Sequence, residues 1–278
     1  MLLKRGLAER TDTQVAFMGS SHVYYGVNPE HLTPRSVNLA YPSQSLQLDD
    51  YIFRTYADSM IDGKYLFLEI AFFLLPYSSE HAQGGVETTL YRHFWNFDDI
   101  RTNSFLKNHF AIASVGISNS IRRGIRHLRG EPPVIRSNRY GWAPRNGRED
   151  LDSTAKIDAN RHNAFWSQDP AFIRKNLRYL GSMITVARKA GIEPVLLSTP
   201  KSMAYRSLLD PGSFKTYENI TDSLSRAADI DFLDFSNDPR FEDAHFSDSD
   251  HLTPEGATLL TQMLNLEIAR LDSQRVSP

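Results

Sequence analysis

The chain has 278 residues, of which 41% are hydrophobic and 23% are charged, as is typical of globular proteins. Its 31 Lys and Arg residues nearly balance its 33 Asp and Glu residues, and the net charge of −2 argues against nucleic acid as a partner. Because the chain has no cysteine, disulfides, thiolate metal sites and cysteine nucleophiles are excluded.

No stretch of the sequence predicts a membrane-spanning helix. The longest apolar stretch, Tyr65 to Pro76, is interrupted by Glu69 and is shorter than the roughly 20 residues that a bilayer requires. The N-terminus lacks the apolar core of a signal peptide. We therefore expect the chain as written to be cytoplasmic, and to belong to the cell envelope if an anchor precedes it.

The first predicted strand is Val15 to Met18, a short apolar run of the kind that is buried on both faces of a sheet. Gly19 ends the run, and Ser20, Ser21 and His22 follow. Ligands bind at the carboxyl edge of open parallel sheets, where Ser21 would lie. Ser21 is therefore a candidate nucleophile.

The turn after Met18 could also have three other functions. The Gly-Lys-Ser/Thr of a phosphate-binding Walker loop is absent, and Val23 stands where the nucleophile elbow of α/β-hydrolases needs glycine. A serine at this point also suits the cap of the following helix. On these residues alone, the cap and the nucleophile both stay open.

Further elements follow with an unusually long gap between two of them. We expect a strand at 36–40, a helix at 46–60 and a central strand at 65–73, but the next strand is at 194–198. Connections in α/β units are about 2–6 residues plus one helix, so an inserted subdomain is predicted at about 75–167.

Within the insertion, apolar residues at helical spacing predict a helix from Phe105 to Leu128. Arginines crowd its other face and the residues after it, as a solvated surface does. The alternative is a surface for an anionic polymer or a membrane partner. These arginines are Arg122, Arg123, Arg126, Arg129, Arg136, Arg139, Arg145 and Arg148.

After the insertion, Asp169 and Pro170 begin a helix that Gly191 ends. A strand at 194–198, a helix at 216–228 and a strand at 231–235 follow. This alternation predicts one domain, 1–278, with a three-layer α/β/α doubly wound parallel sheet and a helical insertion.

The second half of the candidate site lies in the loop that enters the last helix. Thr253 and Pro254 are good residues for the start of that helix, so Asp248 and His251 precede it. Right-handed connections bring this loop to the same sheet edge as Ser21, where serine, histidine and aspartate would converge.

A metal site at Asp248, Asp250 and His251 was also weighed. Leu252 and Thr253 break the calcium-loop pattern, and no paired-histidine metal motif occurs elsewhere. We therefore expect no metal and no cofactor, and a metal-dependent phosphohydrolase is the weakest reading of this stretch.

Taken together, the motifs resemble the SGNH (GDSL-type) hydrolase superfamily. They are Gly19-Ser20-Ser21, Asn38-Leu39-Ala40, and Asp248-x-x-His251 followed by Leu-x-x-x-Gly-Ala. Their order and the long insertion most resemble the branch with the D-alanyl-lipoteichoic-acid transfer protein and cell-envelope polysaccharide acyltransferases and esterases. The resemblance covers both ends of the chain, covers the insertion poorly, and implies a flavodoxin-like fold.

The resemblance implies a role for each matching residue. Ser21 would attack an ester carbonyl, His251 would take its proton, and Asp248 would orient the imidazole. The backbone N–H groups of Ser21 and Ala40 would bind the oxyanion. The superfamily's asparagine donor is missing, because Ile70-Ala71-Phe72-Phe73 stands in its region, and Ser43 or Gln44 would replace it.

Several further side chains are candidate substrate contacts, each with a plainer alternative. His22 would line the acyl pocket, or instead lie at the surface or take part in the start of a helix, and Glu69 would be a paired structural carboxylate. The Arg161-His162 pair would hold an anionic group or lie in an ordinary loop. The candidate substrate-binding residues are His22, Ser43, Gln44, Arg161, His162 and Tyr205.

The sequence thus predicts a serine-dependent acyl-ester enzyme, an O-acyltransferase or esterase acting through an acyl-Ser21 intermediate. Its partners would be an acyl donor and a glycan or cell-envelope polymer as acceptor. The alternative is a non-catalytic protein of the same fold that binds an anionic polymer or a membrane partner.

Overall fold

A computed structural model describes residues 2–78, 95, 97, 125, 128–130 and 137–276. Its centre is a five-stranded parallel sheet in the order β2-β1-β3-β4-β5, which confirms the predicted doubly wound α/β fold. The strands are β1 (Val15–Met18), β2 (Ser36–Asn38), β3 (Tyr65–Glu69), β4 (Glu193–Ser198) and β5 (Phe232–Asp234).

The strands β1 and β3 lie at the centre of the sheet and are fully buried. Every residue of β1 and β3 is buried, because helices cover both faces. From β1 the chain continues to β2 on one side of the sheet, and β3, β4 and β5 then follow on the other side. The strand order therefore switches between β1 and β3, and such a switch point opens a crevice at the carboxyl edge of the sheet. The predicted strand 65–73 ends earlier, at Glu69, because the chain turns at 72–76.

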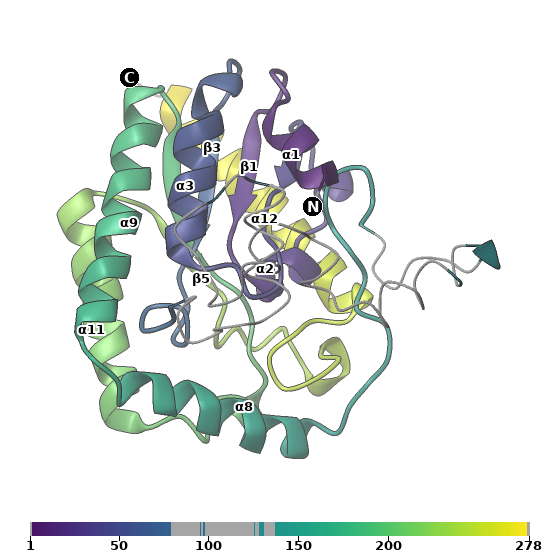
Figure 1. Cartoon of the computed structure of the whole chain (residues 1–278), viewed down its shortest axis with the longest axis vertical. Coiled ribbons are helices and arrows are strands. Elements are labelled where there is room, and N and C mark those ends of the chain that lie inside the picture. Colours follow the sequence, from purple (N-terminus) through teal and green to yellow (C-terminus); the bar gives the residue numbers. More distant parts are fainter. Residues whose placement is uncertain are drawn as a thin grey trace.

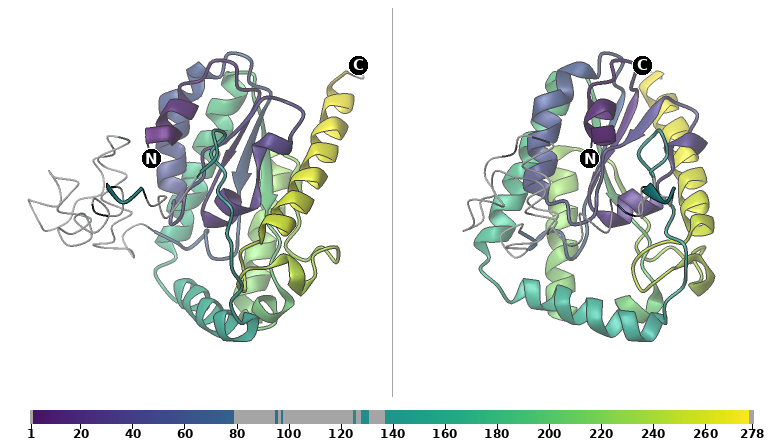
Figure 2. Two further views of the ribbon diagram at one scale, coloured as in Figure 1. Left: turned by 90° about the vertical axis from the view of Figure 1, so that its right-hand side faces the viewer. Right: turned by 45° about the vertical axis from the view of Figure 1, so that its right-hand side comes forward.

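Helices form a layer on each face of the sheet (Figure 1 and Figure 2). One face carries α1, α3, α9 and α11, and the other carries α2 and α12. Their bounds are α1 (Leu2–Ala8), α2 (Ser21–Gly26), α3 (Leu46–Tyr56), α9 (Ala171–Lys189), α11 (Pro211–Ala228) and α12 (Pro254–Val276). Shorter helical segments are Pro29–His31, Ala57–Ser59, α10 (Met203–Arg206) and Asp243–His245.

Helix α8 (Leu151–Trp166) crosses below the carboxyl ends of the strands (Figure 1), in a part of the insertion for which the sequence predicted no element. Asp150 caps its first turn by accepting a hydrogen bond from the Ser153 amide at 2.8 Å. Only Ala155, Ala159 and His162 are buried on this helix. Such a stripe of small and polar residues carries almost no hydrophobic period, so the pattern could not reveal the helix.

The rest of the predicted insertion is described only in part. Most of the helix predicted from Phe105 to Leu128, and four of the eight arginines (Arg122, Arg123, Arg126 and Arg136), lie outside the described residues. Trp95 and Phe97 are buried, and the backbone oxygen of Trp95 accepts a hydrogen bond from the Tyr51 hydroxyl at 2.9 Å. The 75–167 boundary therefore stays a prediction.

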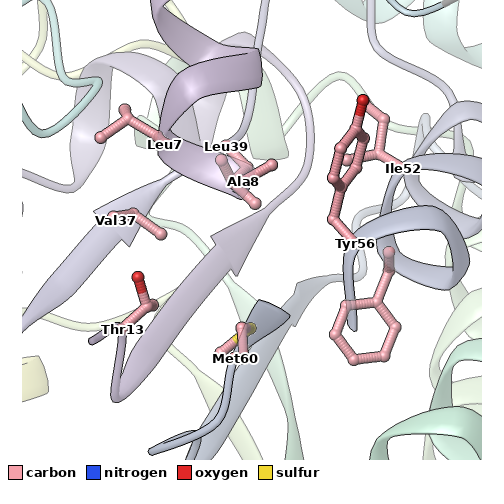
Figure 3. Close-up of a pocket in the computed structure, with 9 residues that line it drawn as sticks. Leu7, Ala8, Thr13, Val37, Leu39, Ile52, Tyr56 and Met60 are labelled. Atoms are coloured by element: carbon pink, nitrogen blue, oxygen red, sulfur yellow. The ribbon is translucent and has the colours of Figure 1, made fainter. Parts of the chain in front are cut away.

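A small apolar pocket lies between α1, β2 and α3 (Figure 3). Leu7, Val37, Ile52 and Met60 are among the side chains that line it, and its volume is about 10 Å³. A cavity of this size holds one water at most, so it is a small packing gap in the core and not a ligand site.

Within the described residues, no helix combines the length and the apolar composition needed to cross a bilayer.

The turn after β1 depends on Gly19. Its φ of +147° is a conformation that side chains other than glycine rarely adopt. A Cβ at this position would lie 2.4 Å from Glu69 Oε2 and 2.5 Å from Glu69 Cβ. Only glycine lets the chain turn this closely over β3.

We therefore expect Gly19→Ala to lower the free energy of unfolding by about 2 kcal/mol or more, through backbone strain and the clash with Glu69. Urea unfolding followed by circular dichroism measures this difference. Gly181→Ala is the matched control, because no atom lies within 4 Å of the added Cβ in the middle of α9. That variant should gain about 0.5–1 kcal/mol, and equal effects at both glycines would contradict the packing argument.

Candidate active site

Ser21 is the first residue of α2, and the residue before it makes the cap. Ser20 has extended backbone angles, and its Oγ accepts a hydrogen bond from the His22 amide. Ser20 therefore caps the helix and leaves the Ser21 hydroxyl for another partner.

That partner comes from a tight loop between β5 and α12. Phe246 and Leu252 form an antiparallel bridge, and the Ser247 amide donates to the His251 carbonyl oxygen at 2.9 Å. Inside this loop, Asp248 Oδ1 accepts hydrogen bonds from the backbone amides of Asp250 at 3.1 Å and His251 at 2.8 Å. The loop therefore fixes the carboxylate before any side chain contacts it.

Ser21, His251 and Asp248 form a continuous chain of contacts. Ser21 Oγ lies 2.7 Å from His251 Nε2, across 230 positions of sequence. His251 Nδ1 lies 2.9 Å and 3.0 Å from the two carboxylate oxygens of Asp248. This is the geometry in which an imidazole accepts the serine proton while the carboxylate selects its tautomer.

Arg145 holds the far side of Asp248, a role that the sequence did not reveal. Its guanidinium donates to Asp248 Oδ2 at 2.5 Å and lies 5.5 Å from the centre of the Tyr25 ring. Tyr25 in turn contacts the His251 ring edge-on at 5.6 Å between ring centres. The sequence assigned Arg145 to a solvated run of arginines, because nothing local connects it with a loop 103 positions away.

Charge around the imidazole shifts the acid–base properties of the triad. Burial would lower the pKa of His251, but the negative charges of Asp250 and Asp248 and the hydrogen bond to Asp248 raise it to about 9. Burial would raise the pKa of Asp248, but the hydrogen bond and charge of His251, together with Arg145, lower it. The structure therefore favours a protonated His251 beside ionised carboxylates.

His22 is not at the surface, as the sequence suggested, but is almost fully buried. Its ring stacks on the His251 ring, with 4.6 Å between centres and 12° between planes. Its Nδ1 lies 3.3 Å from Glu69 Oε1, and Glu69 Oε2 accepts a hydrogen bond from the Ser20 amide at 2.5 Å. Glu69 is thus the paired carboxylate that the sequence predicted, and His22 does not line an acyl pocket.

The groups proposed for the oxyanion are partly engaged elsewhere. The Ala40 amide donates to Asn38 Oδ1 at 3.1 Å, and the Gln44 side-chain amide donates to Asp49 Oδ1 at 2.6 Å. Gln44 is buried, so its amide is committed to the core and cannot replace the missing asparagine. Ser43 is exposed, and the donor role of its hydroxyl stays a prediction.

His162 and Tyr205 are brought together, but not as substrate contacts. The Tyr205 hydroxyl lies 2.7 Å from His162 Nδ1, and both side chains are buried. Burial lowers the pKa of His162 to about 3, so the ring is neutral and cannot hold an anion by charge. Arg161 is exposed and pairs with Asp158 at 3.3 Å, which leaves its proposed substrate contact a prediction.

A metal site was tested on the donors that lie closest together. Among the described residues, His22, Asp250 and His251 offer ligand atoms within 4.8 Å of one another. The lone pair of an imidazole nitrogen lies in the ring plane, and these two rings are stacked nearly parallel. Their lone pairs cannot meet at one point, so the set does not fit a metal ion.

Comparison with known proteins assigns no family to the chain. No protein-family model and no curated protein matches it. A candidate acylhydrolase from Bacteroides fragilis is 12% identical, with 93% of this chain and 88% of that chain covered and a TM-score of 0.45. A candidate platelet activating factor protein from Streptococcus pneumoniae is 14% identical, with 96% and 90% covered and a TM-score of 0.45. Similarity at this level assigns no reaction, so function has to be argued from the site.

Beneath the serine turn lies Asp49, a second buried carboxylate that the sequence did not single out. Burial raises its pKa to about 8, against the opposing effect of hydrogen bonds from Gln44 and the Gly19 amide. The folded state therefore keeps a proton on Asp49 that the unfolded chain releases near its ordinary pKa of 3.8. The resulting stability is complete below about pH 4 and is lost as the pH rises towards about 8.

Asp49→Asn, which imitates the protonated carboxyl, should thus be more stable than the natural protein at pH 8 by more than about 1.4 kcal/mol. The advantage should shrink as the pH falls to 4.5. Urea unfolding at both pH values measures it. Asp222→Asn on the exposed face of α11 is the control, and an equal pH dependence of the two differences would contradict a proton held by Asp49.

Proposed function

We propose that the chain is a serine-dependent ester hydrolase or acyltransferase of the SGNH type. The observation that supports this most is the 2.7 Å contact between Ser21 Oγ and His251 Nε2, with Asp248 on the opposite ring nitrogen. The first residue of α2 and the loop before α12 bring these groups together at one sheet edge, and an activated nucleophile needs that arrangement.

In the proposed reaction, Ser21 Oγ attacks the carbonyl carbon of an ester while its proton moves to His251 Nε2. The tetrahedral intermediate collapses, the ester C–O bond breaks, and His251 returns the proton to the leaving alcohol. Water, or a hydroxyl of an acceptor, then attacks the carbonyl carbon of acyl-Ser21 with His251 again taking its proton. The bond between the acyl carbon and Ser21 Oγ breaks, and His251 returns the proton to Ser21 Oγ. Asp248 stabilises the imidazolium at both steps.

The oxyanion would be bound by the backbone amides of Ser21 and Ala40. Ala40 has to exchange its contact with Asn38 Oδ1 for the oxyanion, which carries a larger charge. Each missing donor costs about 100–1,000-fold in rate, so we expect slower turnover than in an enzyme with a complete set of donors.

For the substrate, we propose an acyl ester on a glycan or cell-envelope polymer. Two features support it: the motifs resemble envelope acyl-transfer proteins, and the insertion carries many arginines that suit an anionic chain. Transfer and hydrolysis use the same acyl-enzyme and differ only in the nucleophile that releases it.

Ser21→Ala should abolish both turnover of a chromogenic acetate ester and labelling by a serine-directed fluorophosphonate. Both depend on an activated hydroxyl, and the fold does not need it because Ser20 makes the cap. Intact-protein mass spectrometry before and after the probe measures the label. Ser223→Ala, on the exposed surface of α11, is the matched control and should be labelled like the natural protein.

Unchanged turnover or labelling of Ser21→Ala would remove Ser21 from the mechanism. If the natural protein takes no label, the second function remains, a non-catalytic protein that binds an anionic polymer or membrane surface. The Ala40 contact with Asn38 favours that alternative, since it leaves the proposed oxyanion site incomplete. Salt-dependent binding to an anionic glycan or to anionic vesicles tests it directly.

The pH dependence of ester turnover follows from the state of His251. Only the neutral ring can accept the serine proton, and the pKa of His251 is raised to about 9. We expect kcat/KM to rise about tenfold per pH unit below that value and to level off above it. A profile that levels off near pH 6.5 would show that the surrounding carboxylates do not act on His251.

A further inference from the structure

A second carboxylate faces the nitrogen of His251 that Asp248 already occupies. Asp250 Oδ1 lies 2.9 Å from His251 Nδ1, and Asp250 is only 3% exposed. That nitrogen carries one hydrogen, and Asp248 accepts it. Asp250 therefore acts on His251 chiefly through its charge, and the reaction steps described above do not use it.

The other oxygen of Asp250 is held by His22. His22 Nε2 lies 2.9 Å from Asp250 Oδ2, while His22 Nδ1 lies 3.3 Å from Glu69 Oε1. Both ring nitrogens thus face carboxylate oxygens, and His22 Nδ1 also lies 3.0 Å from the Ser20 hydroxyl. A polar ring between two buried carboxylates gives them a partner away from water.

We propose that Glu69, His22 and Asp250 form a second carboxylate–imidazole chain whose function is to position and charge-stabilise His251. Asp250 and His22 are positioning residues in this chain of contacts, since it is His251, and neither of their side chains, that hydrogen-bonds the Ser21 hydroxyl. The proposal deepens the proposed ester chemistry and rests on it for its catalytic meaning. The chain of contacts itself is independent of any substrate.

Asp250 lies within 2.9 Å of a nitrogen on each of the two stacked rings, whose centres are 4.6 Å apart. Its negative charge at this short distance stabilises positive charge on His251. Burial would raise the pKa of Asp250, yet the charges of His251 and His22 lower it well below its usual value, in line with this geometry.

Other titratable groups around Asp250 and His251 also affect any pH experiment. They come from α2, from the segment before α8, from α8 itself, from the loop after β4 and from the loop of His251 itself. The Lys201 Nζ, for example, donates to the Asp250 carbonyl oxygen at 3.4 Å. The groups are His22, Tyr25, Arg145, Asp158, His162, Lys201 and Asp248.

Asp250→Asn tests the proposal, because it keeps the shape of the side chain and removes the charge. NMR titration of the histidine rings in isotope-labelled protein should show a His251 titration midpoint at least one pH unit lower than in the natural protein. The rising part of the kcat/KM profile should move by the same amount, which is about a tenfold gain in relative activity below that midpoint. The plateau rate at high pH should fall, since the imidazolium loses a stabilising charge.

Asp243→Asn is the matched control, an exposed carboxylate shortly before the same loop. It should move the His251 midpoint by no more than about 0.3 units, as solvent screens exposed charges. In a His22→Gln background, the shift caused by Asp250→Asn should be less than half as large, because Asp250 is no longer held against the ring. If the shifts of the His251 titration midpoint caused by the two substitutions simply add, His22 does not act through Asp250.

If Asp250→Asn changes stability alone and leaves the His251 midpoint within 0.3 units, the proposal is overturned. Should the variant not fold, the natural protein still decides: a His251 midpoint near the ordinary 6.5 overturns it. The NMR experiment needs no turnover. A shifted His251 titration midpoint without fluorophosphonate labelling would refute the proposed function but support the contacts proposed between Glu69, His22 and Asp250. Labelling without the shift would refute only the role of those contacts.

Discussion

The contact between Ser21 and His251 depends on one very close approach within the sheet. The chain turns at Gly19 directly over the side chain of Glu69, on the neighbouring strand, with no room for a Cβ. This approach brings the Ser20 amide onto the Glu69 carboxylate and starts α2 at the sheet edge. The positions of Ser21 and His22 both follow from it, because they are the first two residues of that helix.

The same approach concentrates buried charge below the site. Glu69 and Asp49 lie under the turn, and Asp248 and Asp250 lie in the opposite loop, so the fold has to stabilise several carboxylates away from water. Asp49 keeps a proton, Glu69 and Asp250 both contact His22, and Asp248 pairs with Arg145. Replacing such groups by apolar residues often stabilises a protein, so their presence points to chemistry more than to stability.

Much of this could be predicted from sequence, and the limits have physical causes. Strand β1, the cap at Thr253 and the loop with Asp248 and His251 are local patterns, and handedness rules bring them to one edge. Helix α8 was missed because its buried stripe is Ala155, Ala159 and His162. Arg145 and the His22–Asp250 pair were missed because they join distant segments, and no spacing in the chain encodes such contacts.

Helix α8 also changes how the predicted insertion relates to the site. Thr154 Oγ1 accepts a hydrogen bond from the Ser249 amide at 3.0 Å, and Asp158 Oδ2 accepts one from the Ser249 hydroxyl at 2.9 Å. Ser249 lies between Asp248 and Asp250, so the helix holds the loop that carries both carboxylates. The segment just before α8 supplies Arg145 to the same loop. The last part of the insertion is therefore a structural part of the candidate active site, and changes in it should alter the geometry around His251.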